Sequence, residues 1–272
     1  MTPGLLSNPR SDRVKAVRAL SRRAVRTQPG LFVADGPQSV REAVTHRPDV
    51  VRDVYVTPDA TRRHAALVEV ALHAGVPVHQ VTDEVLEAMG DTRLAVSPQG
   101  LLAVCRVPSP SLDEVLAAAP RLICVLTHVR DPGNAGTVIR AADAAGADAV
   151  IISVGSVDAF SPKVVRSTAG SVFHLPVVTG LEVEDILARL RAAGLRLLAA
   201  DGSGQTMLDD VDLVPPHAWV MGNEAWGLEQ QVLDRCDDVV RVPIHGLAES
   251  LNLAMAATLC LYASARSQTR RP

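Results

Sequence analysis

The fold is decided by the stretch Val239-Val240-Arg241-Val242-Pro243-Ile244-His245-Gly246-Leu247-Ala248-Glu249-Ser250-Leu251-Asn252, which leads into an Ala- and Leu-rich segment. The β-branched run predicts a strand that ends near Pro243 and Gly246, because neither residue type extends a central strand well. Glu249, Ser250 and Asn252 can cap a helix there, where backbone N–H groups lack partners. In open α/β sheets such junctions bind ligands. Taken alone, the stretch is more typical of an ordinary N-cap before a core helix.

Two earlier segments repeat this plan of strand, polar loop and helix. A predicted strand over Leu122–Leu126 leads into Asp131–Arg140, and one over Ala218–Met221 leads into Gly222–Leu228. The alternation predicts a parallel, doubly wound α/β sheet. Its expected strands are 122–126, 148–153, 196–200, 218–221 and 239–242, and its expected helices are 134–146, 182–193, 226–235 and 250–266. No Gly-x-Gly-x-x-Gly follows the first strand. The chain therefore lacks the phosphate-binding loop that is typical of a dinucleotide-binding Rossmann fold.

The N-terminal part predicts a second, smaller α/β domain over residues 1–106. Its expected strands are 31–34, 50–56, 76–81 and 100–105, with helices between them. Residues 107–119 contain two prolines spaced by serines and then a short helical pattern, which is typical of a semi-rigid linker. We therefore expect a larger domain over residues 120–272.

Charge and composition narrow the function classes. Aromatic residues make up 3% of the chain, which disfavours base-stacking platforms, and the net charge of -3 requires any basic surface to be local. Such a surface is predicted for residues 10–26, where Val14, Val17 and Leu20 form an apolar stripe at helical spacing. We expect its bases to contact RNA phosphates, a solvated helix face being the alternative. They include Arg13, Lys15, Arg18, Arg22, Arg23 and Arg26.

The cysteines and the N-terminus indicate a cytoplasmic protein. The four cysteines are widely spaced in apolar contexts, without a Cys-x-x-Cys pair, so we expect reduced, buried thiols and no metal. No N-terminal apolar region and no run of about 18 apolar residues occurs, which argues against secretion and membrane spanning.

Three motifs resemble the SpoU (TrmH) family of RNA ribose 2′-O-methyltransferases. They are Asn-x-Gly-x-x-x-Arg at Asn134–Arg140, Gly-Asn-Glu-x-x-Gly-Leu at Gly222–Leu228, and Pro-x-x-Gly-x-x-Glu-Ser-Leu-Asn at Pro243–Asn252. The resemblance implies a SPOUT fold with a deep C-terminal trefoil knot, S-adenosylmethionine as cofactor, and a homodimer through the C-terminal domain. Residues 32–36 and 97–100 also resemble the family's substrate-binding domain, which is similar to the ribosomal-protein L30e fold.

The resemblance also implies roles for single residues. Arg140 would hold the substrate phosphodiester as an electrostatic organiser, because its guanidinium stays charged and is a poor base. The implied catalytic set is Asn134, Arg140, Glu224, Ser250 and Asn252. Glu224 would accept hydrogen bonds from the neighbouring loop or from Asn134, while Ser250 and Asn252 would orient the ribose or Arg140. Main-chain groups of Gly222, Val242 and Leu251 would hold the cofactor, and Lys163 and Arg166 would contact RNA.

The expected function is S-adenosylmethionine-dependent 2′-O-methylation of a ribose in structured RNA. The N-terminal domain favours 23S ribosomal RNA, and transfer RNA is the second candidate. A catalytically silent RNA-binding or ribosome-assembly protein is an alternative from another class. A third alternative is an enzyme that modifies a small antibiotic, but such an enzyme would not need the basic residues of 10–26.

Overall fold

The computed structural model describes residues 4–27, 30–90 and 99–269, and it divides into two compact units. The first comprises Met1–Pro108 together with Phe160–His174, and the second comprises Ser109–Ala159 and Leu175–Pro272. The sequence-based division at residues 106–120 did not include the return of Phe160–His174 to the first unit. Ser97 and Pro98, which carried part of the resemblance in the first domain, lie outside the described residues.

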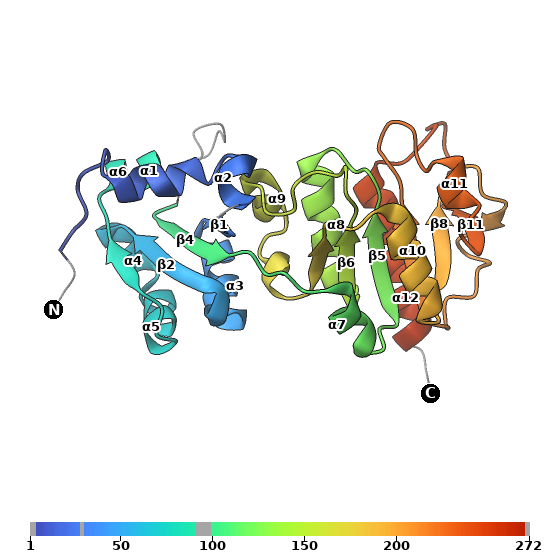
Figure 1. Ribbon diagram of the computed structural model, residues 1–272, viewed down its shortest axis with the longest axis horizontal. Coiled ribbons are helices and arrows are strands. Elements are labelled where there is room, and N and C mark those ends of the chain that lie inside the picture. The colour runs from blue at the N-terminus through green and yellow to red at the C-terminus, as the bar shows by residue number, and fades with distance from the viewer. Residues whose placement is uncertain (1–3, 28–29, 91–98, 270–272) are drawn as a thin grey trace. The chain divides into compact units, whose positions relative to one another are not determined.

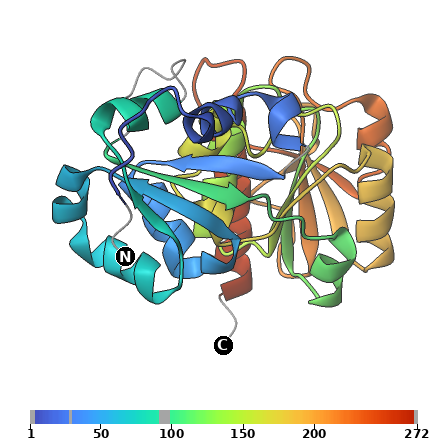
Figure 2. The ribbon, with the colours of Figure 1, turned by 60° about the vertical axis from the view of Figure 1, so that its left-hand side comes forward.

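The first unit is built on a four-stranded sheet with the order β1-β4-β2-β3 (Figures 1 and 2). Strand β4 is antiparallel to both β1 and β2, while β2 and β3 are parallel. The strands are β1 (Leu31–Asp35), β2 (Val51–Val56), β3 (Val78–Gln80) and β4 (Leu101–Arg106). The helices are α1 (Asp12–Ala19), α2 (Arg23–Thr27), α3 (Pro37–His46), η1 (Pro48–Val50), α4 (Pro58–Arg63), α5 (Ala65–His73), α6 (Asp83–Met89), α9 (Pro162–Ser167) and η2 (Ser171–Phe173).

Alternation along β1 separates the two sides of this sheet. Leu31 joins the core beneath α1 and α6, where Val14 and Val17 are buried. The ring of Phe32 instead contacts Phe160 and Phe173, with centroid distances of 5.1 and 5.9 Å. These aromatic contacts hold Phe160–His174, which we call the returning segment, within the first unit.

The predicted basic helix over residues 10–26 is two helices, α1 and α2, separated at Leu20–Arg22. The apolar stripe is confirmed, because Val14, Val17 and Leu20 are all buried.

The second unit contains a seven-stranded sheet in which every neighbouring pair is parallel, as the alternating pattern predicted. The order is β7-β6-β5-β10-β8-β11-β9. The strands are β5 (Leu122–Leu126), β6 (Ala149–Ile152), β7 (Val177–Thr179), β8 (Arg196–Ala200), β9 (Thr206–Met207), β10 (His217–Met221) and β11 (Asp238–Arg241). The helices are α7 (Leu112–Ala117), α8 (Pro132–Ala144), α10 (Val183–Ala192), α11 (Gln230–Leu233) and α12 (Leu253–Thr269). The outermost strands, β7 and β9, were not predicted, because they are too short to show a pattern.

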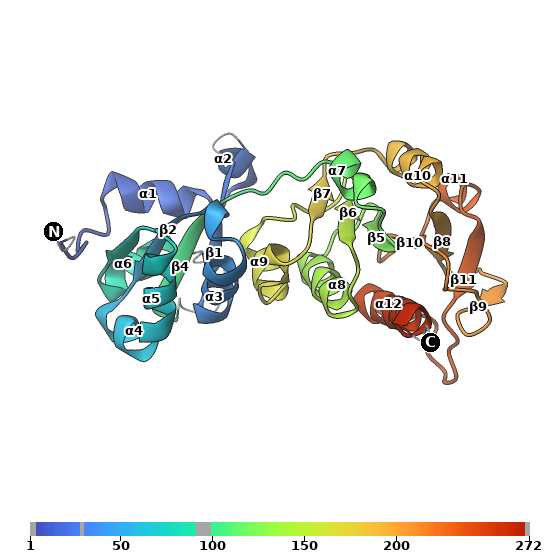
Figure 3. The ribbon, with the colours of Figure 1, turned by 90° about the horizontal axis from the view of Figure 1, so that it is seen from below.

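Helices cover both faces of this sheet (Figure 3). The helices α7, α10 and α11 share one core with inward residues such as Val125 and Ala199. The helices α8 and α12 lie side by side on the opposite face. There Trp219 is fully buried, and its Nε1 donates a 2.8 Å hydrogen bond to Ser264 of α12.

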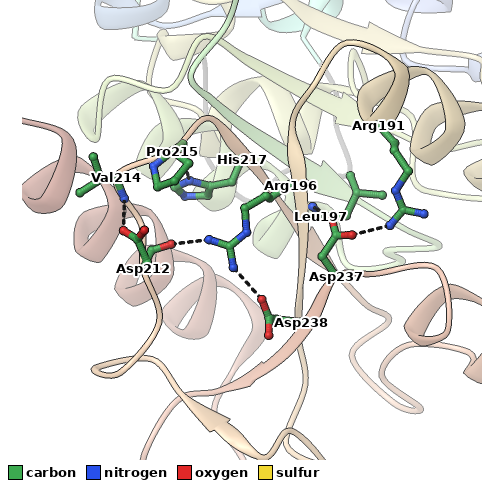
Figure 4. Close-up of polar contacts among 9 residues, drawn as sticks. All are labelled: Arg191, Arg196, Leu197, Asp212, Val214, Pro215, His217, Asp237 and Asp238. Atoms are coloured by element: carbon green, nitrogen blue, oxygen red, sulfur yellow. Dashed lines mark hydrogen bonds and ion pairs between the residues drawn. The ribbon is translucent and has the colours of Figure 1, made fainter.

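Ion pairs and hydrogen bonds join the starts of β8 and β11 at one edge of the sheet (Figure 4). Arg196 donates to the Asp212 carbonyl at 2.8 Å and to the Asp238 carboxylate at 2.6 Å. Asp237 accepts from Arg191 at 2.8 Å and from the Leu197 N–H at 2.7 Å. These contacts join the starts of β8 and β11. The polar motifs lie at the opposite edge, where the strands have their carboxyl ends.

The burial that the sequence predicted for the four cysteines is found for three of them. Cys105, Cys124 and Cys260 are buried free thiols, and burial raises the pKa of each; Cys236 is half-buried. Across the described ranges, no helix combines the length and the apolar character needed to cross a membrane.

His217 makes the stability of the second unit dependent on pH. Its imidazole is fully buried, with Nδ1 2.8 Å from the Pro215 carbonyl and Nε2 2.7 Å from the Ser264 hydroxyl. Burial lowers the pKa of His217, and the hydrogen bond to Pro215 offsets this only in part. At pH values below about 6.5 the unfolded chain therefore binds a proton that the folded state resists.

We expect the free energy of unfolding to be fully retained above about pH 6.5 and to fall below it, by at most about 1.4 kcal/mol per pH unit for this one group. Urea denaturation at pH 7.5 and 5.5 measures the loss. His217→Gln should lose less stability on acidification than the unchanged protein. An identical loss in both proteins would contradict the assignment.

Candidate functional site

The carboxyl ends of β5 and β10 lie next to each other at the centre of the sheet. Thr127, the first residue after β5, donates to the Met221 carbonyl at the end of β10 through its N–H and its hydroxyl, each at 2.9 Å. Because the strands are parallel, the first two motifs leave the sheet at the same edge. This pairing places Asp131–Arg140 beside Gly222–Leu228.

The second motif forms a tight turn. Asn223 and Gly227 exchange backbone hydrogen bonds of 2.8 and 3.0 Å, and the Asn223 side chain donates to the His128 carbonyl at 2.7 Å. A Cβ at position 222 would lie 2.3 Å from the Gly227 carbonyl carbon, so only glycine fits there. Gly222 therefore permits close approach of its own loop, whereas the sequence suggested approach of a cofactor.

The Glu224 carboxylate connects this turn to the first motif. One oxygen accepts from the Arg130 N–H at 3.1 Å, and the other accepts from the Asp131 N–H at 3.0 Å. The second oxygen also accepts from the Asn134 side chain at 3.2 Å. The contact between Glu224 and Asn134 that the sequence suggested is thus present.

The surroundings of Glu224 keep it ionised. Partial burial raises its pKa, but hydrogen bonds from the backbone of Arg130, Glu224 and Asp131 and from the Asn134 side chain outweigh burial and leave the pKa below its ordinary value. A carboxylate with a lowered pKa is a weak base at neutral pH. Glu224 is therefore suited to positioning its neighbours and not to removing a proton.

Asn134 links Glu224 to the third motif. Asn252 caps α12 by accepting from the Ala254 N–H at 2.9 Å, which leaves its amide nitrogen as the donor. That nitrogen donates to Asn134 Oδ1 at 3.0 Å. Asn134 then donates to Glu224, so each of the three side chains has one orientation that satisfies its partners. We call Glu224, Asn134 and Asn252 the motif network, since each comes from a different motif.

The other two predicted catalytic residues lie outside the motif network. Arg140 is exposed on α8, and its guanidinium makes no hydrogen bond to any residue that the structure describes. Ser250 is also exposed and has no such bond within the described ranges, so Asn252 alone of the three candidates caps α12. The predicted contact of Asn252 with Arg140 is replaced by its contact with Asn134.

The three predicted cofactor residues follow β10, follow β11 and precede α12, respectively. Gly222 is buried after β10, Val242 is half-buried after β11, and Leu251 is 38% exposed just before α12. Among the described residues, no main-chain N–H from Ile244 to Leu251 donates a hydrogen bond. The third motif therefore offers free backbone donors and exposed apolar side chains.

Most of the predicted RNA-binding residues are exposed, although Lys15 pairs with Asp12 at 3.0 Å and Arg13 Nη1 lies 3.5 Å from Nδ1 of His79. Arg13, Lys15, Arg18, Arg22, Arg23 and Lys163 lie on the surface. Arg26 is only 5% exposed and donates to the Leu20 carbonyl at 2.6 Å. Arg166 pairs with Asp35 of β1. Burial raises the pKa of Asp35, and the Arg166 guanidinium only partly counteracts this.

Sequence reasoning missed two residues that shape the site. Asp131 caps α8 by accepting from the Asn134 N–H at 2.7 Å, which fixes the backbone of Asn134. An acidic residue before Pro132 is an ordinary sign of a helix start and could have identified it. Asn223 anchors the second motif to His128, for which the sequence gives no signal beyond the motif itself.

Comparisons with known proteins agree with this geometry. The SpoU rRNA Methylase family matches residues 121–262, and the MRM3-like substrate binding domain matches residues 11–103. The Bacillus subtilis 23S rRNA (guanosine(2553)-2'-O)-methyltransferase RlmP is 33% identical, over 94% of this chain and 97% of its own.

Solved structures show the same relationship over both units. An AdoMet-bound rRNA methyltransferase from Sinorhizobium meliloti is similar with a TM-score of 0.83 and 28% identity, covering 98% of each chain. The SpoU methyltransferase AviRb from Streptomyces viridochromogenes, in complex with AdoMet, has a TM-score of 0.82 and 31% identity, covering 97% of this chain and 100% of its own. With its three motifs joined at one sheet edge, the chain belongs to the SpoU rRNA methylase family.

Proposed function

We propose that the protein methylates a ribose 2′-hydroxyl of 23S ribosomal RNA with S-adenosylmethionine as methyl donor. The observation that carries this proposal is the motif network, in which one side chain from each motif is held in a single orientation. A protein that only binds RNA has no need of such a network. Relatives named as 23S rRNA 2′-O-methyltransferases, such as RlmP of Bacillus subtilis, support the substrate. A ribosomal RNA substrate also favours a cytoplasmic location.

The third motif fits the cofactor. S-adenosylmethionine supplies an electrophilic methyl group when bound. The main-chain N–H groups from Ile244 to Leu251, which donate to no other described residue, suit its polar atoms, and the apolar side chains of Val242 and Leu251 suit a flat adenine. We assign Gly222, Val242 and Leu251 to cofactor binding, with Gly222 acting through the tight turn it permits. We also propose the family's trefoil knot, which agrees with the insertion of β10 between β5 and β8.

The chain's own residues would orient the hydroxyl and stabilise charge. The methyl group would come from the cofactor, and residues of this chain would orient the 2′-hydroxyl that receives it. Glu224 and Asn252 hold Asn134 on both sides, so its position is set before substrate arrives. Ser250, exposed two residues before Asn252, is proposed to contact the ribose.

Arg140 is assigned to the substrate phosphate. Its guanidinium is exposed and unengaged within the described residues, which leaves its donors for an incoming anion. A permanent positive charge next to the 2′-oxygen would stabilise the alkoxide as the proton leaves.

We propose that the exposed basic side chains of α1, of α2 and of the turn between them contact RNA in the first unit. Arg26 is not part of this surface, because its guanidinium is buried. In the returning segment we retain Lys163, while Arg166 contributes through its pair with Asp35.

We further propose a homodimer formed through the second unit. Helix α12 exposes Met255, Leu259 and Tyr262, which are 58, 46 and 44% exposed. Their spacing places them on one face of the helix, while Ala254, Ala257 and other residues face the sheet. An apolar stripe of this kind on a surface helix favours a protein partner, and a second copy of this chain is the proposed one.

Methyl transfer tests the main proposal. Purified protein with isotope-labelled S-adenosylmethionine should label unmodified 23S ribosomal RNA at a single ribose, which reverse-transcription stops at low nucleotide concentration would locate. Transfer RNA serves as the competing substrate. Labelling of transfer RNA alone would replace the substrate assignment, and no labelling of either RNA by folded, cofactor-bound protein would contradict an enzymatic function.

Two substitutions at Asn252 separate its cap from its contact with Asn134. Asn252→Ala should lower both turnover and stability, the latter by about 1 kcal/mol for the lost cap. Asn252→Asp keeps an oxygen for the Ala254 N–H but cannot donate to Asn134, so stability should hold while turnover falls about tenfold, as for a hydrogen bond of about 1.5 kcal/mol. Normal turnover in Asn252→Asp would remove the motif network from the mechanism.

The salt dependence of RNA binding tests the basic surface. Each phosphate contact should contribute about -0.7 to -0.9 to the log–log slope of affinity against salt. Arg22→Gln with Arg23→Gln should flatten the slope by up to about two contacts and leave cofactor affinity unchanged. Arg62→Gln with Arg63→Gln makes the same charge change at residues paired with Asp59 and is the control. If the slope of affinity against salt were equal in all three proteins, the basic side chains of α1 and α2 would be solvated and would not contact RNA.

Sedimentation tests the dimer. Leu259→Glu places a charge in the exposed stripe of α12 and should convert a dimer into a monomer with little methyl transfer. Leu72→Glu alters another exposed leucine, 57% accessible, in the first unit and should leave the dimer intact. If the unchanged protein sediments as a monomer at micromolar concentration, the proposal is wrong.

A further inference from the structure

Two histidine rings and one carboxylate converge in the first unit, which contains none of the three motifs. Oε2 of Glu42 lies 3.3 Å from Nε2 of His46 and 3.1 Å from Nε2 of His174. One ligand atom from each residue lies within 4.8 Å of the other two. The two rings meet edge to face, with centroids 4.7 Å apart. Among the described residues, this is the one group of His, Cys, Asp or Glu that could hold a metal ion.

The separations match those between ligands of one metal ion. Zinc–nitrogen and zinc–oxygen bonds of about 2.0–2.1 Å at tetrahedral angles place neighbouring ligand atoms about 3.3 Å apart. The two separations from Glu42 Oε2 are close to this value. We propose that Glu42, His46 and His174 bind one divalent transition-metal ion, for which Zn²⁺ is the reference, with a fourth position open to water.

The fold holds these ligands in place without the ion. Glu42 and His46 are four residues apart on α3, so their side chains share one face of the helix. A Cβ at Gly170 would lie 2.3 Å from Glu42 Cγ, so the backbone of the returning segment packs directly on the carboxylate stem. Phe173 is 3% exposed against Phe32 and thereby fixes the start of His174.

The donor set selects the kind of ion. Two imidazole nitrogens and one carboxylate oxygen suit Zn²⁺, Co²⁺, Ni²⁺ and Cu²⁺, whereas Mg²⁺ and Ca²⁺ prefer oxygen ligands alone. The adjacent cation, Arg47, is paired with Asp49 through bonds of 2.8 and 2.9 Å. Its charge is thereby compensated close to the site.

The ion would act as a clip within the first unit. Two ligands come from α3 and the third from the end of the Phe160–His174 segment, which follows β6 in the chain. Binding would add a cross-link to the aromatic and ionic contacts that already hold this segment. The sequence alone predicted no metal, because His174 is far from Glu42 and His46 along the chain.

Titration of tag-free, full-length protein with Co²⁺ tests the site. We expect one equivalent to bind with the visible absorption of a four-coordinate ion, and Zn²⁺ but not millimolar Mg²⁺ to displace it. His46→Gln and His174→Gln should each weaken binding about tenfold or more. His79→Gln is the matched control, because His79 lies 2.7 Å from the Asp53 carboxylate but has no third ligand within the described part of the chain.

A second measurement uses the unchanged protein and does not depend on variants that fold. Zn²⁺ should protect His46 and His174 from diethyl pyrocarbonate while the exposed His73 still reacts. Absence of one-equivalent binding, or equal affinity in His46→Gln, His174→Gln and the control, would overturn the proposal. Neither result bears on methyl transfer, so the proposed function is tested separately.

Discussion

The site depends on one carboxylate that bridges two neighbouring loops. Glu224 follows β10, and the N–H groups it accepts from, those of Arg130 and Asp131, follow β5. This contact is available only because β10 lies beside β5 and parallel to it, which places both carboxyl ends at one edge. The same carboxylate holds Asn134, and Asn134 in turn meets the cap of α12. The strand order thus connects three motifs that are distant in the sequence through one series of hydrogen bonds.

Polar groups at this edge divide into those that the chain satisfies and those that it leaves free. Asn134, Glu224 and Asn252 satisfy one another, and the lowered pKa of Glu224 shows that the carboxylate is stabilised as an anion. Arg140, Ser250 and the backbone from Ile244 to Leu251 have no such partners within the described residues. A group that must position others gains from being fixed beforehand, whereas a group that binds substrate or cofactor must keep its donors available. This division supports the proposed roles better than the presence of the motifs alone.

The sequence predicted those features that depend on local pattern or on the motifs. The five longer strands of the second unit were found because each is a short apolar run bounded by turn residues, as at Leu122–Leu126. The contact between Asn134 and Glu224 was suggested by the motifs, although its geometry requires the strand order. Strands β7 and β9 carry no periodic signal, since they have only three and two residues. The burial of Arg26 and the pairing of Arg166 with Asp35 depend on tertiary packing, so neither could be predicted from the charge pattern of residues 10–26 or from the family resemblance around Arg166.

The returning segment gives Arg166 a structural role that the sequence did not predict. Residues 160–174 follow β6 in the chain but belong by their contacts to the first unit. Phe160 and Phe173 pack on Phe32, and Arg166 pairs with Asp35, whose other oxygen is buried without a hydrogen bond among the described residues. Replacing Arg166 would leave that carboxylate buried and unpaired, which costs more than an exposed phosphate contact provides. The Arg166 guanidinium is therefore first a structural group.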